Sequence, residues 1–319
     1  MSKPLSRLLR REQWAFLARD RSAWGEHLAR VRAFLGEGLQ AADPSRPVLI
    51  LGAGSGLEVP WALAPPDTTG WDADPWSRAW TALRHRRWAP WVFADLTGGL
   101  AELEATARRA ARESWTGRRR DPEVAALRLA GLLPSLRPDP APLRAWIAAH
   151  RPGTILVANV MGQFGVVAER LVESAFLRPP WEADPERPDP LATALEAWTG
   201  QVLRAFLEVL AESGADLWLV HDRAVIFSGG GLELGPWEEA WGRQLTSEGA
   251  PIEASDALAG LELPPLLTAG GREVVRRERW LWPVAAGQRH LIEALVTRRP
   301  GWGAVASVNP CPHSLPQQP

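Results

Sequence analysis

The chain has 319 residues, of which 46% are hydrophobic and 23% are charged, and its formal net charge at pH 7 is −1. This length allows one elaborated domain or two small ones, with enough apolar side chains for a full core. The near-zero charge argues against a general nucleic-acid binder, which carries a basic excess. No run of 18 or more apolar residues is present to span a bilayer.

The cysteine and histidine usage excludes further classes of site. Cys311 is the single cysteine, so internal disulfides and cysteine-based zinc sites are excluded. The histidines show no H-x-x-H or H-E-x-x-H spacing, and we expect no metal. The N-terminus lacks the apolar core of a secretory signal, so we expect a cytoplasmic protein. GC-rich codon usage explains part of the Trp-rich composition, and some Trp rings are candidates to line a pocket.

The elements predicted along the chain alternate between helix and strand. Apolar residues recur every three or four positions in the helical segments, whereas short apolar runs that end in polar residues or glycine predict buried strands. Helices are predicted at 5–41, 76–87, 99–115, 121–133, 141–149, 165–178 and 191–213. Strands are predicted at 48–51, 91–94, 154–158 and 216–220, with a last strand at 288–297 that pairs with 273–284. The Pro-rich loop 178–190 is predicted to be either a lid or a solvated connector.

This alternation predicts an α/β fold: a Rossmann-like, doubly wound, mostly parallel sheet with helices on both faces. We predict an N-terminal helical extension at 1–45, the Rossmann-like domain at 46–299 and a flexible Pro-rich tail at 300–319. We expect helical insertions in the domain at 97–150 and 223–272.

The most informative segment is RPVLILGAGSGLEVPWALA, residues 46–64. A predicted strand runs into the glycine loop, Gly52-Ala53-Gly54-Ser55-Gly56, and then into a predicted helix that places Pro60 in its first turn. Glycines allow a sharp turn and a close approach of the backbone to a ligand. The N-terminus of the helix predicted after the loop presents its backbone N–H groups to that ligand.

An acidic residue completes the pattern. Asp72 follows the next short segment, Thr69-Gly70-Trp71, and lies 20 residues after Gly52. A carboxylate at this spacing accepts hydrogen bonds from a ribose diol. The dinucleotide fingerprint needs a third glycine where this chain has Leu57, so a nicotinamide cofactor is disfavoured.

These motifs resemble the class I S-adenosylmethionine (SAM)-dependent methyltransferases over residues 46–222. The strand with G-x-G-x-G and the acid Asp72 are similar to the first two motifs of that superfamily. Asp95 matches the acid after strand three, which the resemblance assigns to the adenine amine. The resemblance therefore implies SAM as cofactor, held by Gly52, Ala53, Gly54, Gly56, Asp72 and Asp95.

The catalytic residues are less determined by the pattern. Polar groups that follow the strands predicted at 154–158 and 216–220 gather at the cofactor side of such a sheet, which singles out Asn159, Gln163, His221 and Asp222. His221 is a candidate general base or a structural histidine. Glu58 either faces the sulfonium or stabilises the N-terminus of the predicted helix. Asp74 is predicted to cap the helix that starts near Trp76.

The resemblance implies methyl transfer to a small-molecule or peptide acceptor, with a homodimer as a possible assembly. The Asn/Asp-Pro-Pro-aromatic motif of many amino-group methyltransferases is absent, because Val160 and Met161 follow Asn159. Two alternatives stay open. The same fold can transfer an aminopropyl or aminocarboxypropyl group, or it can serve as a catalytically inactive binding protein.

Overall fold

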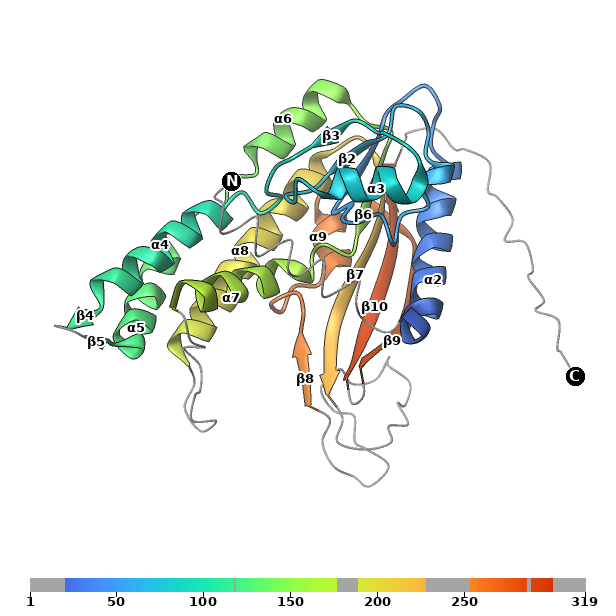
Figure 1. Ribbon diagram of the computed structural model, residues 1–319. Coiled ribbons are helices and arrows are strands. Elements are labelled where there is room, and N and C mark those ends of the chain that lie inside the picture. The colour runs from blue at the N-terminus through green and yellow to red at the C-terminus, as the bar shows by residue number, and fades with distance from the viewer. Residues whose placement is uncertain (1–20, 117–118, 177–188, 228–252, 286–287, 301–319) are drawn as a thin grey trace, which may run out of the picture.

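A single large mixed sheet organises the chain. The computed structural model describes residues 21–116, 119–176, 189–227, 253–285 and 288–300 (Figure 1). The strands of the sheet follow the order β3-β2-β1-β6-β7-β10-β9, and β8 pairs with β7. Their bounds are β1 Val48–Leu51, β2 Thr69–Trp71, β3 Trp91–Val92, β6 Thr154–Ala158, β7 Asp216–Phe227, β8 Glu253–Asp256, β9 Glu273–Ala285 and β10 Gln288–Arg298.

The parallel part of the sheet confirms the predicted Rossmann-like fold. Strands β3, β2, β1, β6 and β7 are parallel neighbours. The chain order therefore reverses between β1 and β6, and in open α/β sheets such a switch point is where ligands bind, outside the carboxyl ends of the strands. The closing strands are antiparallel: β10 pairs with β7 and β9 pairs with β10, and of these two pairings the sequence predicts the second.

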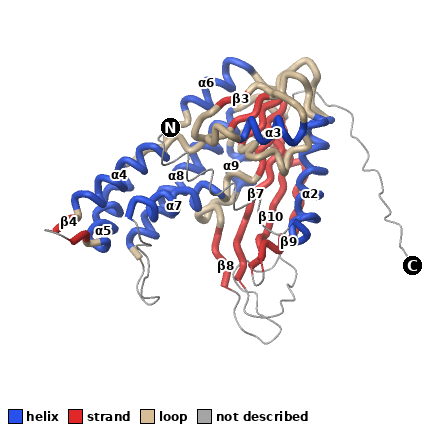
Figure 2. Tube along the Cα trace, in the orientation of Figure 1, coloured by secondary structure: helices blue, strands red, loops and turns tan. Residues whose placement is uncertain are grey.

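Two apolar layers cover the sheet. The four residues of β1 are fully buried, and they alternate between the two layers because successive side chains of a strand point to opposite faces. Leu49 and Leu51 pack against the layer that contains α4, α7 and α8, whereas Val48 and Ile50 pack against α2. Helices thus cover both faces, as Figure 2 shows for α2 and for the helices opposite it.

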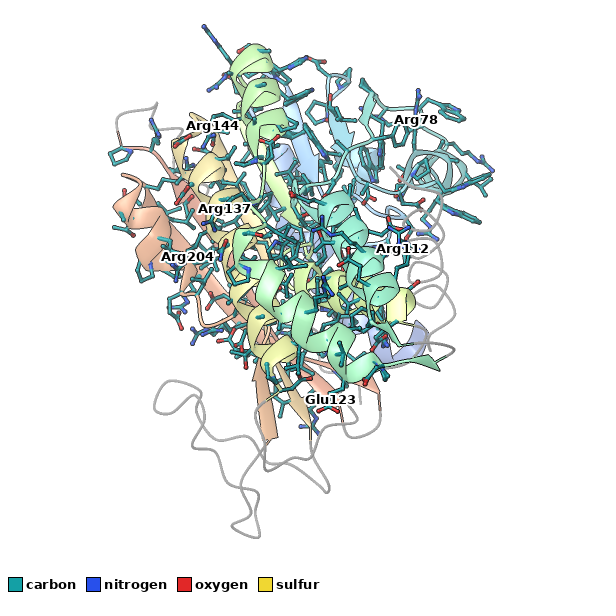
Figure 3. The ribbon with its side chains drawn as sticks, turned by 90° about the vertical axis from the view of Figure 1, so that its left-hand side faces the viewer. Arg78, Arg112, Glu123, Arg137, Arg144 and Arg204 are labelled. Atoms are coloured by element: carbon teal, nitrogen blue, oxygen red, sulfur yellow. The ribbon has the colours of Figure 1, made fainter. Side chains whose placement is uncertain are left out.

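Six of the helices that the structure describes match predicted helical segments within a few residues. The bounds of the helices are α2 Arg21–Gln40, α3 Ser77–His85, α4 Leu100–Glu113, α5 Pro122–Leu132, α6 Ala141–His150, α7 Gln163–Phe176, α8 Pro190–Glu212 and α9 Leu263–Ala269. A short pair, β4 Trp115–Thr116 and β5 Arg119–Arg120, joins α4 to α5 at the tip of a helical arm (Figure 1). Figure 3 views the molecule from the side of this arm; its labelled Arg112, Glu123, Arg144 and Arg204 are exposed side chains of α4, α5, α6 and α8, whereas Arg137 lies in the loop before α6.

One predicted element is wrong, because no α-helix follows the glycine loop. Only a single 3-10 turn forms, at Trp61–Leu63. Pro60 comes before this turn and Pro65-Pro66 follows it, and proline supplies no backbone N–H and disfavours a helical conformation in the residue before it. The stretch between the prolines is therefore too short for a regular helix.

Other predicted elements are shorter in the structure or are only partly described. The strand predicted at 91–94 covers only Trp91–Val92. Of the helix predicted at 5–41, the structure describes only the part in α2. Residues 1–20 lie outside the described part of the chain, as do the predicted loop and tail segments 178–188, 228–236 and 301–319. Among the described residues, no helix is long and apolar enough to cross a membrane.

Candidate functional site

The glycine loop leaves β1 at the switch point and turns sharply over the end of β2. The N–H groups of Gly52 and Ala53 both donate to the carbonyl of Trp71, at 3.0 and 3.3 Å. Gly52 and Gly56 each have φ of +69°, in the left-handed region that disfavours other residues. A Cβ at Gly52 would lie 2.4 Å from the Cβ of Val160, so the loop also needs glycine for space.

The structure brings the glycine loop and Asp72 into direct contact. The Gly54 N–H donates to Oδ2 of Asp72 at 2.8 Å, and the Asp74 N–H donates to Oδ1 at 2.8 Å. Burial raises the pKa of Asp72 to about 6, against the opposing effect of these two N–H groups. A carboxylate offers about four acceptor sites, so capacity remains for a ligand hydroxyl.

Three side chains hold the carbonyl groups of the loop, and the sequence pattern did not reveal them. Arg84 donates to the Ser55 carbonyl at 3.0 Å, and Arg32 donates to the Leu57 carbonyl at 2.6 Å. His85 Nε2 lies 2.8 Å from the Gly56 carbonyl, and burial lowers the pKa of this histidine. These contacts from α2 and α3 take the place of the missing helix, because they fix a loop that has no helical hydrogen bonds of its own.

The two other predicted acids near the loop have local partners. Asp95 accepts hydrogen bonds from the N–H groups of Thr97, Gly99 and Leu100, and so it caps the start of α4. The side chain of Asp74 accepts from the N–H of Trp76, in agreement with its predicted capping role. Both carboxylates therefore shape the loops that follow β2 and β3.

The polar residues after β6 and in β7 lie on two sides of the sheet. Asn159 has φ of +48°, donates its N–H to the Val220 carbonyl, and buries a side-chain Oδ1 that makes no hydrogen bond. Asp222 lies beside Gly162, where an added Cβ would be 2.9 Å from the Asp222 Cβ. His221, the next residue along the strand, faces the opposite side and is fully buried, with Nε2 3.5 Å from Oε2 of Glu293.

Histidines far apart in the sequence meet near Asp222. His290 Nδ1 lies 3.3 Å from Oδ1 of Asp222, and the His290 ring makes an edge contact with Trp282 at 5.3 Å. The His27 ring stacks on Trp282 with a centroid distance of 3.9 Å. No spacing rule could find this group, because its members come from α2, β7, β9 and β10. Within the described ranges, no group of three or more His, Cys, Asp or Glu residues is arranged to hold a metal ion.

Comparison with protein-family models and with curated proteins gave no match. Among solved structures, the chain is similar to the N-methyltransferase NodS from Bradyrhizobium japonicum WM9, with 12% identity, a TM-score of 0.39, and coverage of 88% of this chain and 99% of that chain. It is also similar to the glycopeptide N-methyltransferase MtfA complexed with SAM, with 13% identity, a TM-score of 0.36, and coverage of 85% and 94%. A third is the magnesium protoporphyrin IX methyltransferase ChlM from Synechocystis PCC 6803 with bound SAM, with 9% identity, a TM-score of 0.34, and coverage of 86% and 80%. These TM-scores are low, and the fold assignment rests on the strand order of this chain.

Proposed function

We propose that this chain binds SAM at the carboxyl ends of β1 and β2 and transfers its methyl group to a small-molecule or peptide acceptor. The observation that carries the proposal is the hydrogen bond between the Gly54 N–H and the Asp72 carboxylate. It joins the glycine-rich loop to an acid with spare acceptor capacity, an arrangement suited to an adenosyl group.

The loop has the space that such a ligand needs. A Cβ built at Gly54 would meet nothing nearer than the Gly52 carbonyl oxygen, at 3.7 Å, so this edge of the loop is open. In the proposal, Asp72 accepts hydrogen bonds from the ribose hydroxyls, and the open edge at Gly54 receives the ligand closely. The residues present therefore fit the cofactor.

When bound, SAM supplies a methyl group activated by its sulfonium. Such a transfer depends mainly on alignment of the two reactants, which alone contributes about 7 to 11 kcal/mol in favourable cases. We assign this alignment to Asn159, directly after β6, and to Asp222, within β7 beside Gly162. We assign His221 a structural role, since it is fully buried against Glu293. The contact of Asp95 with an adenine amine remains a prediction.

Isothermal titration with SAM tests the binding step. The expected result is saturable binding to the wild-type chain and loss of binding in Asp72→Ala, because this variant removes the acceptor for the ribose hydroxyls. Asp67→Ala is the matched control, since Asp67 is exposed and lies two residues before β2. Absence of wild-type binding at millimolar SAM would refute the proposal.

Mass spectrometry of the product tests which group is transferred. The proposal expects the acceptor to gain the mass of one methylene unit, the net change when a methyl group replaces a proton. An increase that matches an aminopropyl or aminocarboxypropyl group would instead favour the alternative chemistry on the same fold.

A further inference from the structure

A group of polar and aromatic side chains lies between α2 and the antiparallel strands. We call it the ribbon cluster, and it consists of His27, Glu58, Asp222, Trp282 and His290. Figure 1 shows the first turns of α2 beside the long ends of β9 and β10. His27 stacks on Trp282, and its Nδ1 accepts a hydrogen bond from the indole of Trp280 at 3.2 Å. The five residues therefore form one continuous set of contacts.

Buried polar atoms of the ribbon cluster lack hydrogen bonds. Four such atoms are His27 Nε2, Glu58 Oε1, Asp222 Oδ1 and Trp282 Nε1. His27, Asp222 and Trp282 are each about 98% buried, and His27 Nε2 points toward Glu58 Oε1 across 3.8 Å. Buried polar groups in native proteins are almost always hydrogen-bonded, and leaving one unpaired costs stability. A set of four in one place therefore indicates a missing partner.

The electrostatics of the ribbon cluster favour a cation as that partner. Glu58 and Asp222 have no arginine within ion-pair distance among the described residues, and their nearest basic groups are the imidazoles of His27 and His290. On the other side of the sheet, Glu293 contacts both Arg277 and Arg279 at 2.6 to 2.7 Å. Two carboxylates and an indole ring that share the neighbours His27 and His290 attract organic cations through charge and through the ring face.

The position of the ribbon cluster ties it to the proposed cofactor loop. Glu58 follows Gly56 by two residues. Asp222 lies two residues beyond Val220, which pairs with the last residue of β6, and it contacts the segment at Gly162. Both carboxylates thus lie at the carboxyl end of the sheet, where the second reactant of a transfer has to approach. That the ligand of the ribbon cluster is the acceptor rests on the proposed function.

We propose that the ribbon cluster binds the acceptor, and that the acceptor carries a protonated amine. The ammonium group donates hydrogen bonds to Glu58 and Asp222, while Trp282 and its neighbouring rings contact the carbon skeleton. A neutral hydroxyl compound of the same shape brings no charge to the two carboxylates and is bound more weakly.

The first test compares matched probes on the wild-type chain. Titrations of phenethylamine and 2-phenylethanol, and of methylamine and methanol, are run with and without S-adenosylhomocysteine. The amines are expected to bind at least about tenfold more tightly than the alcohols, since hydrogen bonds to charged groups are the strong ones. Equal affinities, or no amine binding at millimolar concentration, would overturn the inference. This comparison needs no substitution, so it stands even where a variant fails to fold.

The second test uses variants at the two carboxylates. Asp222→Asn and Glu58→Gln keep the side-chain shapes and are expected to weaken amine binding by about tenfold or more. Their melting temperatures are expected to stay equal or to rise, because each change removes a buried charge that lacks a strong partner. Glu26→Gln is the matched control, since Glu26 neighbours His27 on α2 but is exposed and paired with Arg30. If the variants lose stability but bind amines as tightly as the wild type, the ribbon cluster has only a structural role and the inference is wrong.

The SAM titration separates this inference from the proposed function. A chain that binds SAM but does not prefer amines refutes the inference alone. A chain that binds amines but not SAM refutes the proposed function, although the ribbon cluster then still binds organic cations.

Discussion

Two buried carboxylates show how local partners decide the chemistry of a residue. Burial raises the pKa of Asp72 to about 6, so ionisation of Asp72 costs folding free energy as the pH rises through that value. Burial also acts to raise the pKa of Glu293, but the nearby imidazole of His221 and the hydrogen bonds from Arg279 and Arg277 lower it to about 2. Glu293 therefore contributes stability above its ordinary pKa of 4.5, and this stability is lost as the pH falls toward about 2.

The pKa of Asp72 predicts a pH dependence of cofactor binding. The ionised carboxylate is the better acceptor for ribose hydroxyls, so the affinity for SAM is expected to fall as the pH drops below about 6. Titrations across this range measure the effect. Asp72→Asn cannot titrate, and it is expected to bind more weakly with no such dependence. An affinity that is constant through this range in the wild type would contradict the assigned role of Asp72.

The partners of Glu293 predict the cost of removing its charge. Glu293→Gln is expected to lower the free energy of unfolding at neutral pH by about 1 to 3 kcal/mol, because the charge-assisted bonds to Arg277 and Arg279 weaken. Denaturant unfolding measures this change. Glu278→Gln on the neighbouring strand β9 is the control, since Glu278 is 42% exposed and its pair with Arg276 is of the weak surface kind. Equal costs in the two variants would show that burial of Glu293 is unimportant.

At the scale of elements, α2 contributes more than an amphipathic face. It lies close enough to the sheet that a Cβ at Gly38 would be 2.8 Å from the ring of Trp218. Arg32 of this helix also donates to the carbonyl of Leu57, the residue directly after the glycine loop. The helix thus connects the packing of one sheet face with the geometry of the loop.

This close approach predicts opposite effects for two glycines of the same helix. Gly38→Ala is expected to destabilise the fold by about 1 to 3 kcal/mol, because the added methyl group overpacks the contact with Trp218. Gly25→Ala is the control, since an added Cβ there meets nothing within 4 Å, and alanine stabilises a helix by roughly 0.5 to 1 kcal/mol over glycine. Thermal unfolding measures both, and a stabilising Gly38→Ala would contradict the observed packing.

At the scale of the whole molecule, the sheet unites sequence-distant segments around one end. Arg272, between α9 and β9, donates to the carbonyls of Ser213 and Ala215 and to the Thr297 hydroxyl. Burial lowers the pKa of this arginine to about 10. Its contacts tie the end of α8, the start of β7 and the end of β10 together, opposite the end where the loop and the ribbon cluster lie.

A ligand held by so many segments is expected to stabilise the entire fold. SAM at 100 times its dissociation constant should raise the free energy of unfolding by about 2.7 kcal/mol, since it binds only the folded chain. Differential scanning fluorimetry measures the shift in melting temperature. Asp72→Ala should show no shift, and a shift of wild-type size in that variant would indicate binding elsewhere.

Much of this fold was predictable because its signals are local. Hydrophobic periodicity places the helices and strands, and the run 48–51 with its glycines places the turn at the switch point. The missing helix after Gly56 is an informative exception. Pro60 alone is acceptable in the first turn of a helix, but together with Pro65-Pro66 it leaves too few residues for one. A rule that considers each proline separately does not detect this combination.

The sequence by itself determined the glycine loop, the acid that follows the next strand and the alternation that makes a parallel sheet, because each depends on residues close together in the chain. The tertiary structure alone decided that His27 and His290 share one tryptophan, that Asp222 and His221 face opposite sides, and that Arg32 and Arg84 hold the loop. These contacts depend on helix packing, strand order and register, which join residues from 25 to more than two hundred positions apart and leave no mark in the spacing of either segment.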